Sequence, residues 1–247
     1  MDYSSPPVRE VAFGFEFDPS TALDGWRLIT LQDTWGSDFP ERRILPAKPR
    51  AVPLDFAVDP APQDVDLPLL VWASNPASGL LLQSQRDRFF LNWRAVEPSS
   101  DYPGFLALMP TFTRRWAQVR EHCLTAGSPP PSPSVAEFTY VNVLDGVDTA
   151  RPTFSLTFHA EPSLPGRNTV ANLQVHQELD EVGDGGSLTV NAFGGGDGAP
   201  LTLIICTRLR VGVGADPLAR LAEAHAVSRQ AFDHVTTAEA KREWGLR

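Results

Sequence analysis

The sequence predicts an α+β fold of two layers, in which a curved, mostly antiparallel sheet carries long helices on one face. Three observations lead to this prediction. Short segments alternate apolar and polar residues with the period of two that strands require. Glycine-rich turns join several of these segments. Two longer segments repeat apolar residues at the spacing of three and four that is typical of amphipathic helices.

A proline-rich stretch divides the chain into parts of similar length. GSPPPSPS, residues 127–134, is typical of an extended, exposed connector. It separates an N-terminal α+β half, residues 1–126, from a C-terminal half of antiparallel sheet and helices, residues 135–247. Each half ends in strands followed by a long helix. This order favours two related halves, although no residue repeat accompanies it.

The first half opens with a strand and a helix. VREVAFGFEF, residues 8–17, alternates as a strand does. Asp18-Pro19 follows as a helix start, with Asp as N-cap and Pro at the first position, and predicts a helix to about Trp35. The proline-rich residues 40–68 predict loop with short edge strands.

Strands are expected next near 51–58 and 68–73, followed by a hairpin at 80–96 with Arg86-Asp87 as its turn. Alternation assigns each hairpin residue to one face of the sheet. The face toward the core receives Leu80, Leu82, Phe89, Leu91 and Trp93. The opposite face receives Gln83, Gln85, Arg88, Asn92 and Arg94, with Leu81 and Phe90 among them. Because the amides are uncharged, they suit hydrogen bonding in a partly buried place.

The first half closes with a long amphipathic helix. Its apolar stripe consists of Phe105, Met109, Phe112, Trp116, Val119 and Cys123, with Pro110 as a possible kink.

The second half is mostly strands. Alternating segments occur at residues 137–144, 153–161, 169–181, 187–193 and 201–211. GDGG (183–186) and GGGDG (194–198) read as hairpin loops between them. One side of each strand is apolar and the other polar, so the sheet should carry helices on one face only. The polar side includes Asn172, Gln174, His176 and Asn191.

Two helices end the chain. Asp216-Pro217 starts the first, whose inner stripe includes His225 as a hydrogen-bonded core residue. Thr236 with Glu239 three residues later predicts a capping box for a short last helix, which carries Trp244 back onto the body. Trp26, Trp116 and Trp244 are expected in core stripes rather than in a base-stacking platform.

Composition narrows the function classes. The chain has 21 basic and 30 acidic residues and a net charge of −9. An acidic chain without a basic run does not favour nucleic acid or an anionic membrane, and no apolar stretch is long enough to span a bilayer. Cys123 and Cys206 predict buried thiols rather than a disulfide framework or a zinc site. Without a signal sequence, the expected location is cytoplasmic.

Several stretches resemble a sporadically distributed bacterial family of uncharacterised cytoplasmic proteins of about this length. They are EVAFGFEF, LLLQSQRDRFFLNWR, DYPGF, EFTYVNVL with its Tyr-x-Asn strand, and the closing EWG. The most specific part is the Gln-x-Gln…Asn-Trp-Arg hairpin followed by Tyr-Pro, here Gln83, Gln85, Asn92, Trp93, Arg94, Tyr102 and Pro103. The resemblance implies a bacterial cytoplasmic protein and brings no catalytic or ligand residues.

The pattern His-x-Glu occurs twice, as His159/Glu161 and as His176/Glu178. Residues two apart on a strand share a face, so the two pairs could meet on one ion if the hairpin register placed the histidines opposite each other. A hydrated polar face is the simpler interpretation. We therefore predict no metal and no cofactor. No nucleophile elbow or paired acid–base carboxylates occur, so catalysis is not expected, although the enzyme question stays open.

Two functions remain. The first is a non-enzymatic interaction or self-association module, which binds a protein partner or a second copy through the polar sheet face. Its binding-face candidates are Gln83, Gln85, Arg88, Asn92, Arg94, Asn172, Gln174, His176 and Asn191. The alternative is a small-ligand pocket between sheet and helix, with or without weak metal-dependent activity.

Overall fold

The structure is a computed structural model that describes residues 6–47, 69–97, 100–144, 172–180, 182–194 and 200–245. The strands within these residues are β1 (Val8–Phe17), β2 (Glu41–Pro46), β3 (Leu69–Asn75), β4 (Leu80–Gln85), β5 (Arg88–Arg94), β6 (Pro133–Leu144), β7 (Asn172–Glu178), β8 (Gly186–Gly194) and β9 (Leu201–Arg210). The α-helices are α1 (Gly25–Asp33), α2 (Phe105–Thr125), α3 (Pro217–Val235) and α4 (Ala238–Glu243). Two short 3₁₀ turns, Thr21–Leu23 and Gly36–Asp38, flank α1.

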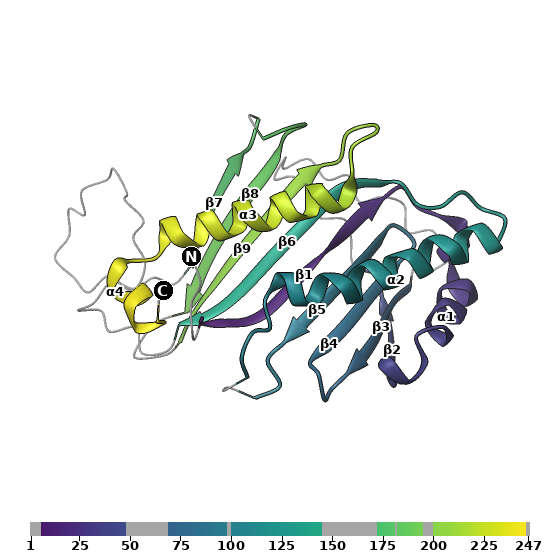
Figure 1. The fold of residues 1–247 in the computed structure, drawn as a ribbon, viewed down its shortest axis with the longest axis horizontal. Coiled ribbons are helices and arrows are strands. Elements are labelled where there is room, and N and C mark those ends of the chain that lie inside the picture. Colours follow the sequence, from purple (N-terminus) through teal and green to yellow (C-terminus); the bar gives the residue numbers. More distant parts are fainter. Residues whose placement is uncertain are drawn as a thin grey trace.

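The predicted α+β class is confirmed. The described strands form one antiparallel sheet in the order β2-β3-β4-β5-β1-β6-β9-β8-β7, which does not close into a barrel. The long helices α2 and α3 cross the same face of this sheet and run in opposite directions (Figure 1). Among the described helices, none combines the length and apolar character that a membrane span requires.

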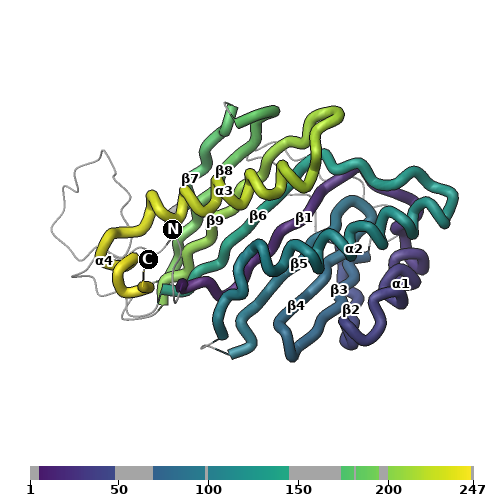
Figure 2. The backbone as a smooth tube through the Cα atoms, viewed as in Figure 1, coloured from purple at the N-terminus to yellow at the C-terminus, as the bar shows by residue number. Residues whose placement is uncertain are grey.

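The order of strands mirrors itself about the central pair β1 and β6. On one side β1 is followed by β5, β4 and β3, and on the other β6 is followed by β9, β8 and β7. In each half the outermost of these strands comes first along the chain and a long helix follows the innermost, α2 after β5 and α3 after β9. Figure 2 shows the two halves side by side in one continuous sheet. Strand β2 lies beyond β3 and has no counterpart beyond β7 among the described strands, so the correspondence covers three strands and one helix on each side.

Aromatic side chains fill the space between α2 and the sheet. Phe13 and Phe15 on β1 contact Phe112 at ring-centroid distances of 5.3 Å, and Phe15 contacts Trp116 at 5.2 Å. These rings are buried, and burial of each large apolar side chain contributes about 1.5–3 kcal/mol to folding. Cys123 is fully buried on the same stripe, and both cysteines are free thiols. The predicted core face of α2 is therefore confirmed.

The hairpin register is also confirmed, because β4 and β5 pair across an Arg86-Asp87 turn with Gln85 opposite Arg88. Asp216 caps α3 as predicted, since its carboxylate accepts a hydrogen bond from the Leu218 amide at 3.0 Å. The short strand β2 lies at the sheet edge, in agreement with edge strands in the proline-rich region. The strands expected near 51–58 and at 153–161 lie outside the described residues.

Two expected helix boundaries are wrong. The helix expected from Asp18 to about Trp35 is a 3₁₀ turn, then α1 and a second turn. The break occurs at Asp24, which is extended with φ −93° and ψ 142°, and at Gly25, where α1 begins with a φ of +47° outside the right-handed helical region. The cap of α4 is Thr237 rather than Thr236. The Thr236 hydroxyl instead donates a hydrogen bond of 2.6 Å back to the Phe232 carbonyl oxygen.

The tryptophans divide between core and surface. Trp116 is buried, and Trp244 packs against Phe232 with ring centroids 5.5 Å apart, as expected. Trp26 is 79% exposed, so its assignment to a core stripe is wrong. It lies in the first turn of α1, and the buried stripe of that helix is formed by Leu28 and Leu31.

Candidate functional site

The polar residues of the hairpin form a hydrogen-bonded chain across three strands on the face away from the long helices. Gln83 donates to Asn92 at 2.7 Å, and Asn92 donates to Glu10 on β1 at 2.9 Å. Arg94 donates to the same carboxylate through Nε at 3.1 Å and Nη2 at 2.9 Å. The amides therefore have partners within the sheet.

A second chain joins charged residues nearer the turn. Glu16 on β1 accepts a hydrogen bond from Arg208 on β9 at 2.7 Å, and Arg88 lies 3.8 Å from Glu16. Arg208 also donates to Glu137 on β6 at 2.8 Å. Burial raises the pKa of Glu137, and the attraction of Arg208 opposes this shift only in part. Two carboxylates thus share the Arg208 guanidinium in a partly desolvated place.

Accessibility differs along the predicted binding face. Gln85 and Asn92 are buried, each 3% exposed, while Gln83 and Arg88 are half-buried and Arg94 is exposed. A residue that is buried and bonded within its own chain offers little to a partner. The hairpin part of this face is consequently better suited to holding strands together than to docking.

The second-half members of the face lie on β7 and β8. Gln174 is exposed, His176 and Asn191 are half-buried, and the side chain of Asn172 lies outside the described residues. His176 bonds Thr189 at 3.1 Å and Glu178 at 2.9 Å. Within the described part of the chain, no group of three or more His, Cys, Asp or Glu side chains could hold a metal ion. His159 and Glu161 lie outside it.

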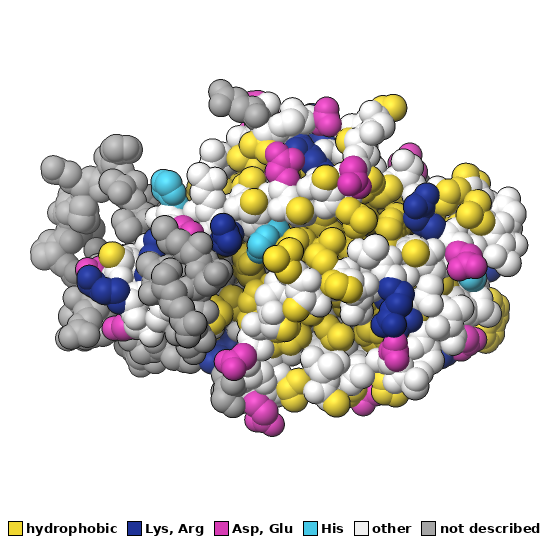
Figure 3. Space-filling model, in the orientation of Figure 1, with side chains coloured by type: hydrophobic (Ala, Val, Ile, Leu, Met, Phe, Trp, Pro, Cys, Tyr) yellow, Lys and Arg dark blue, Asp and Glu magenta, His cyan; other side chains and the backbone are white. Residues whose placement is uncertain are grey.

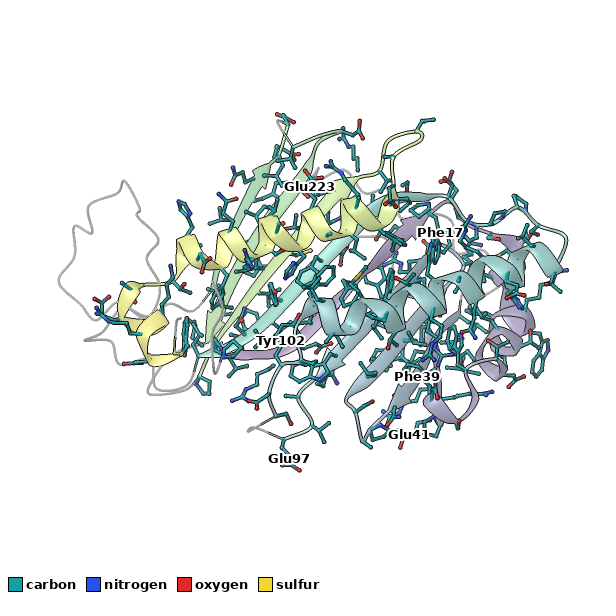
Figure 4. All side chains as sticks on the ribbon, in the orientation of Figure 1. Phe17, Phe39, Glu41, Glu97, Tyr102 and Glu223 are labelled. Carbon is teal, nitrogen blue, oxygen red and sulfur yellow. The ribbon has the colours of Figure 1, made fainter. Side chains whose placement is uncertain are left out.

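The opposite face holds a pocket of about 390 Å³ between the start of α2, the second half of α3 and β6. Figure 3 shows hydrophobic side chains gathered in the space between α2 and α3. Tyr102 lies beside the N-terminal end of α2 (Figure 4). The polar or aromatic side chains that matter most in the wall are those of Tyr102, Phe105, Tyr140, Asn142, His225 and Arg229.

Local sequence rules explain how these residues meet. Gly104 has φ +88° and ψ 150°, a conformation accessible to glycine, and it turns the chain from Tyr102 into α2. Alternation along β6 places Tyr140 and Asn142 on the helix side of the sheet. His225 and Arg229 are four residues apart on α3 and therefore share one face of the helix.

A neutral histidine forms part of the wall of this pocket. His225 bonds the Tyr140 hydroxyl through Nε2 at 3.0 Å, and its ring stacks on Phe105 with centroids 4.3 Å apart. Burial, with a smaller effect from Arg229, lowers the pKa of His225 to about 4. Burial also raises the pKa of the Tyr140 phenol. At neutral pH, Arg229 is therefore the only lining residue in the described chain that carries a charge.

Two buried polar atoms in the wall have no hydrogen-bond partner. Asn142 is fully buried and donates through Nδ2 to the Leu203 carbonyl oxygen at 3.2 Å, which leaves its Oδ1 without a donor. The Tyr102 hydroxyl lies near that of Tyr140 but does not meet hydrogen-bonding geometry. An unsatisfied buried polar atom costs about 1–3 kcal/mol, so such atoms call for a functional or structural explanation.

The predicted binding-face residues lie on the opposite face of the sheet, and the sequence predicts a pocket between sheet and helix only as the alternative and without its lining residues. Tyr102, Tyr140 and Asn142 were noted only within stretches that carry a resemblance, and Arg229 was not singled out. One signal was present, because Asn142 falls on the apolar side of an alternating strand. The i, i+4 pair His225 and Arg229 was a second signal. Neither reveals a pocket until α2 and α3 are placed on the sheet.

Comparisons with protein families, curated proteins and solved structures find no match to this chain.

Proposed function

We propose that this protein binds a small organic molecule in the pocket between α2, α3 and β6. The observation that supports the proposal most is a mostly apolar cavity of about 390 Å³ whose wall contains the buried and partnerless Oδ1 atom of Asn142. Ligand sites are typically concave and mostly apolar, with a few polar groups that fix orientation, and range from about 300 to 1,000 Å³. The pocket meets each of these criteria.

The hydrogen bonding of polar groups on the two faces of the sheet favours ligand binding in the pocket over the interaction module. On the polar sheet face, the half-buried amide of Gln83 and the buried amide of Asn92 are already bonded within the sheet. In the pocket, by contrast, Asn142 Oδ1 is buried and lacks a partner. A bound molecule with a donor would satisfy this atom and recover the free energy that its burial costs.

The experiment uses the neutral apolar dye N-phenylnaphthylamine, whose fluorescence increases when it leaves water. We expect saturable binding to the full chain. Ala107 is an exposed residue of α2 in the pocket wall, so Ala107→Trp should fill the cavity and abolish dye binding without disturbing the core. Native mass spectrometry of the purified protein would additionally report a co-purified ligand.

Ala117→Trp is the matched control, because Ala117 is also exposed on α2 but does not line the pocket. This variant should bind the dye as the parent protein does. Dye binding that persists in Ala107→Trp, or no dye binding to a folded parent protein, would contradict the proposal.

A further inference from the structure

We infer that the ligand of this pocket is an organic anion, such as a carboxylate, whose apolar body carries an N–H or O–H donor. The inference rests on the proposed function and specifies the chemistry of the molecule bound. It draws on three features of the wall: the open N-terminus of α2, the cation Arg229 and the vacant acceptor of Asn142.

The N-terminus of α2 opens into the pocket. This helix has 21 residues, and Gly104, at its N-cap, provides no side-chain hydrogen bond to the first turn. Gly104, Phe105, Leu106 and Ala107 all line the cavity. The first N–H groups of a helix lack partners within it and lie at the positive end of the helix dipole, so they favour a negatively charged group.

Arg229 adds a formal positive charge to the pocket wall. It is exposed, and within the described structure it makes no hydrogen bond or ion pair. Asp233, whose charge acts on Tyr140, is not among the lining residues. Desolvation keeps His225 neutral, so this imidazole does not supply the charge. An anion would therefore meet two positive sources and no lining carboxylate.

Asn142 specifies the rest of the ligand. Its Oδ1 is an acceptor, since Nδ2 is committed to the Leu203 carbonyl oxygen. An acceptor in a buried wall selects a ligand donor, which an anionic group alone lacks. At the packing density of protein interiors, 390 Å³ accommodates about fifteen non-hydrogen atoms. Phe105, Leu106 and Phe232 also line the cavity, so its wall suits an apolar body.

Three related probes separate these features. Indoleacetate carries both the anion and the N–H donor, indoleacetamide lacks the charge, and N-methylindoleacetate lacks the donor. We expect indoleacetate to bind at least about tenfold more tightly than either of the others in ligand-observed NMR titrations. N-phenylnaphthylamine should compete with it. Arg229→Gln should remove the advantage over the amide, and Asn142→Leu the advantage over the N-methyl compound.

Arg120→Gln is the control, because Arg120 is an exposed arginine of α2 outside the pocket wall. It should leave all three affinities unchanged. If the amide binds as tightly as the acid, or if the dye binds but all three indoles fail, the inference is overturned while the proposed function stands. If neither the dye nor any indole binds the folded protein, the proposed function itself falls. Circular dichroism of each variant confirms that it is folded.

Discussion

At the scale of single residues, the pocket wall departs from ordinary core chemistry. A buried asparagine with a free acceptor and a histidine held neutral beside an arginine both cost stability. Natural proteins tolerate such costs mainly where function requires them. Asn142 and His225 therefore differ in kind from Gln83 and Asn92, which are polar, partly or fully buried and bonded to each other.

His225 should make stability depend on pH. Its pKa falls from 6.5 to about 4 on folding, because burial disfavours the charged ring. Between these pH values His225 is protonated in the unfolded chain but stays neutral in the folded chain. The free energy of unfolding therefore falls as the pH drops from 6.5 toward 4. We expect His225→Gln, which keeps an amide near Tyr140, to lose less unfolding free energy over this range. Urea denaturation at several pH values measures the difference.

His234→Gln is the comparison for this measurement, because His234 is an exposed residue of the same helix. Its pH profile should run parallel to that of the parent protein. If the free energy of unfolding depends equally on pH in the parent protein and in His225→Gln, then the pKa of His225 does not change on folding.

At the scale of elements, the two networks of hydrogen-bonded polar side chains connect neighbouring strands of the sheet. Arg208 contacts two carboxylates, and its side chain is 20% exposed. Arg94 contacts one, and its side chain is 59% exposed. We expect Arg208→Met to lower the free energy of unfolding by about 3–5 kcal/mol, because it leaves Glu16 and Glu137 without their shared cation. Arg94→Met should cost about 0–1 kcal/mol, since exposed ion pairs contribute little.

Chemical denaturation of both variants tests this contrast. If Arg208→Met and Arg94→Met lower the free energy of unfolding by similar amounts, then burial does not set the strength of these ion pairs.

Local patterns were sufficient for most elements and insufficient for the site. Alternation fixed which hairpin residues face the helices, and the Asp216 cap located the start of α3, because both depend on neighbouring residues alone. The helix after β1 was misjudged, since Asp18-Pro19 resembles a start signal while the conformation of Gly25 interrupts the helix. The pocket depends on residues from three elements far apart in sequence, and no local pattern encodes their meeting.

At the scale of the whole molecule, the sheet is continuous through its centre. β1 and β6 pair antiparallel from Val8 to Phe17, so the two halves share one sheet although a proline-rich connector separates them in sequence. The pocket lies where the halves meet, with α2 from one and α3 from the other. Neither half contains the complete wall.

Self-association through the polar face stays a prediction, and its exposed end allows a test. Gln174→Glu with Asn191→Asp places two negative charges on β7 and β8, where the side chains are exposed and half-buried. If a partner or second copy docks there, the double variant should fold normally but lose the complex in size-exclusion chromatography with light scattering. Survival of the parent protein's assembly in the folded variant, or a parent protein that is monomeric without a partner, would remove this hypothesis.

The position of the pocket links ligand binding to the stability of the junction between the two halves. A molecule bound in the proposed site would contact α2 from one half and β6 and α3 from the other, so it would stay bound only while the halves are joined. Binding to the joined form alone must favour that form by mass action, so the ligand concentration would set how often the junction opens. The free energy that holds the two halves together would then rise with the concentration of the ligand.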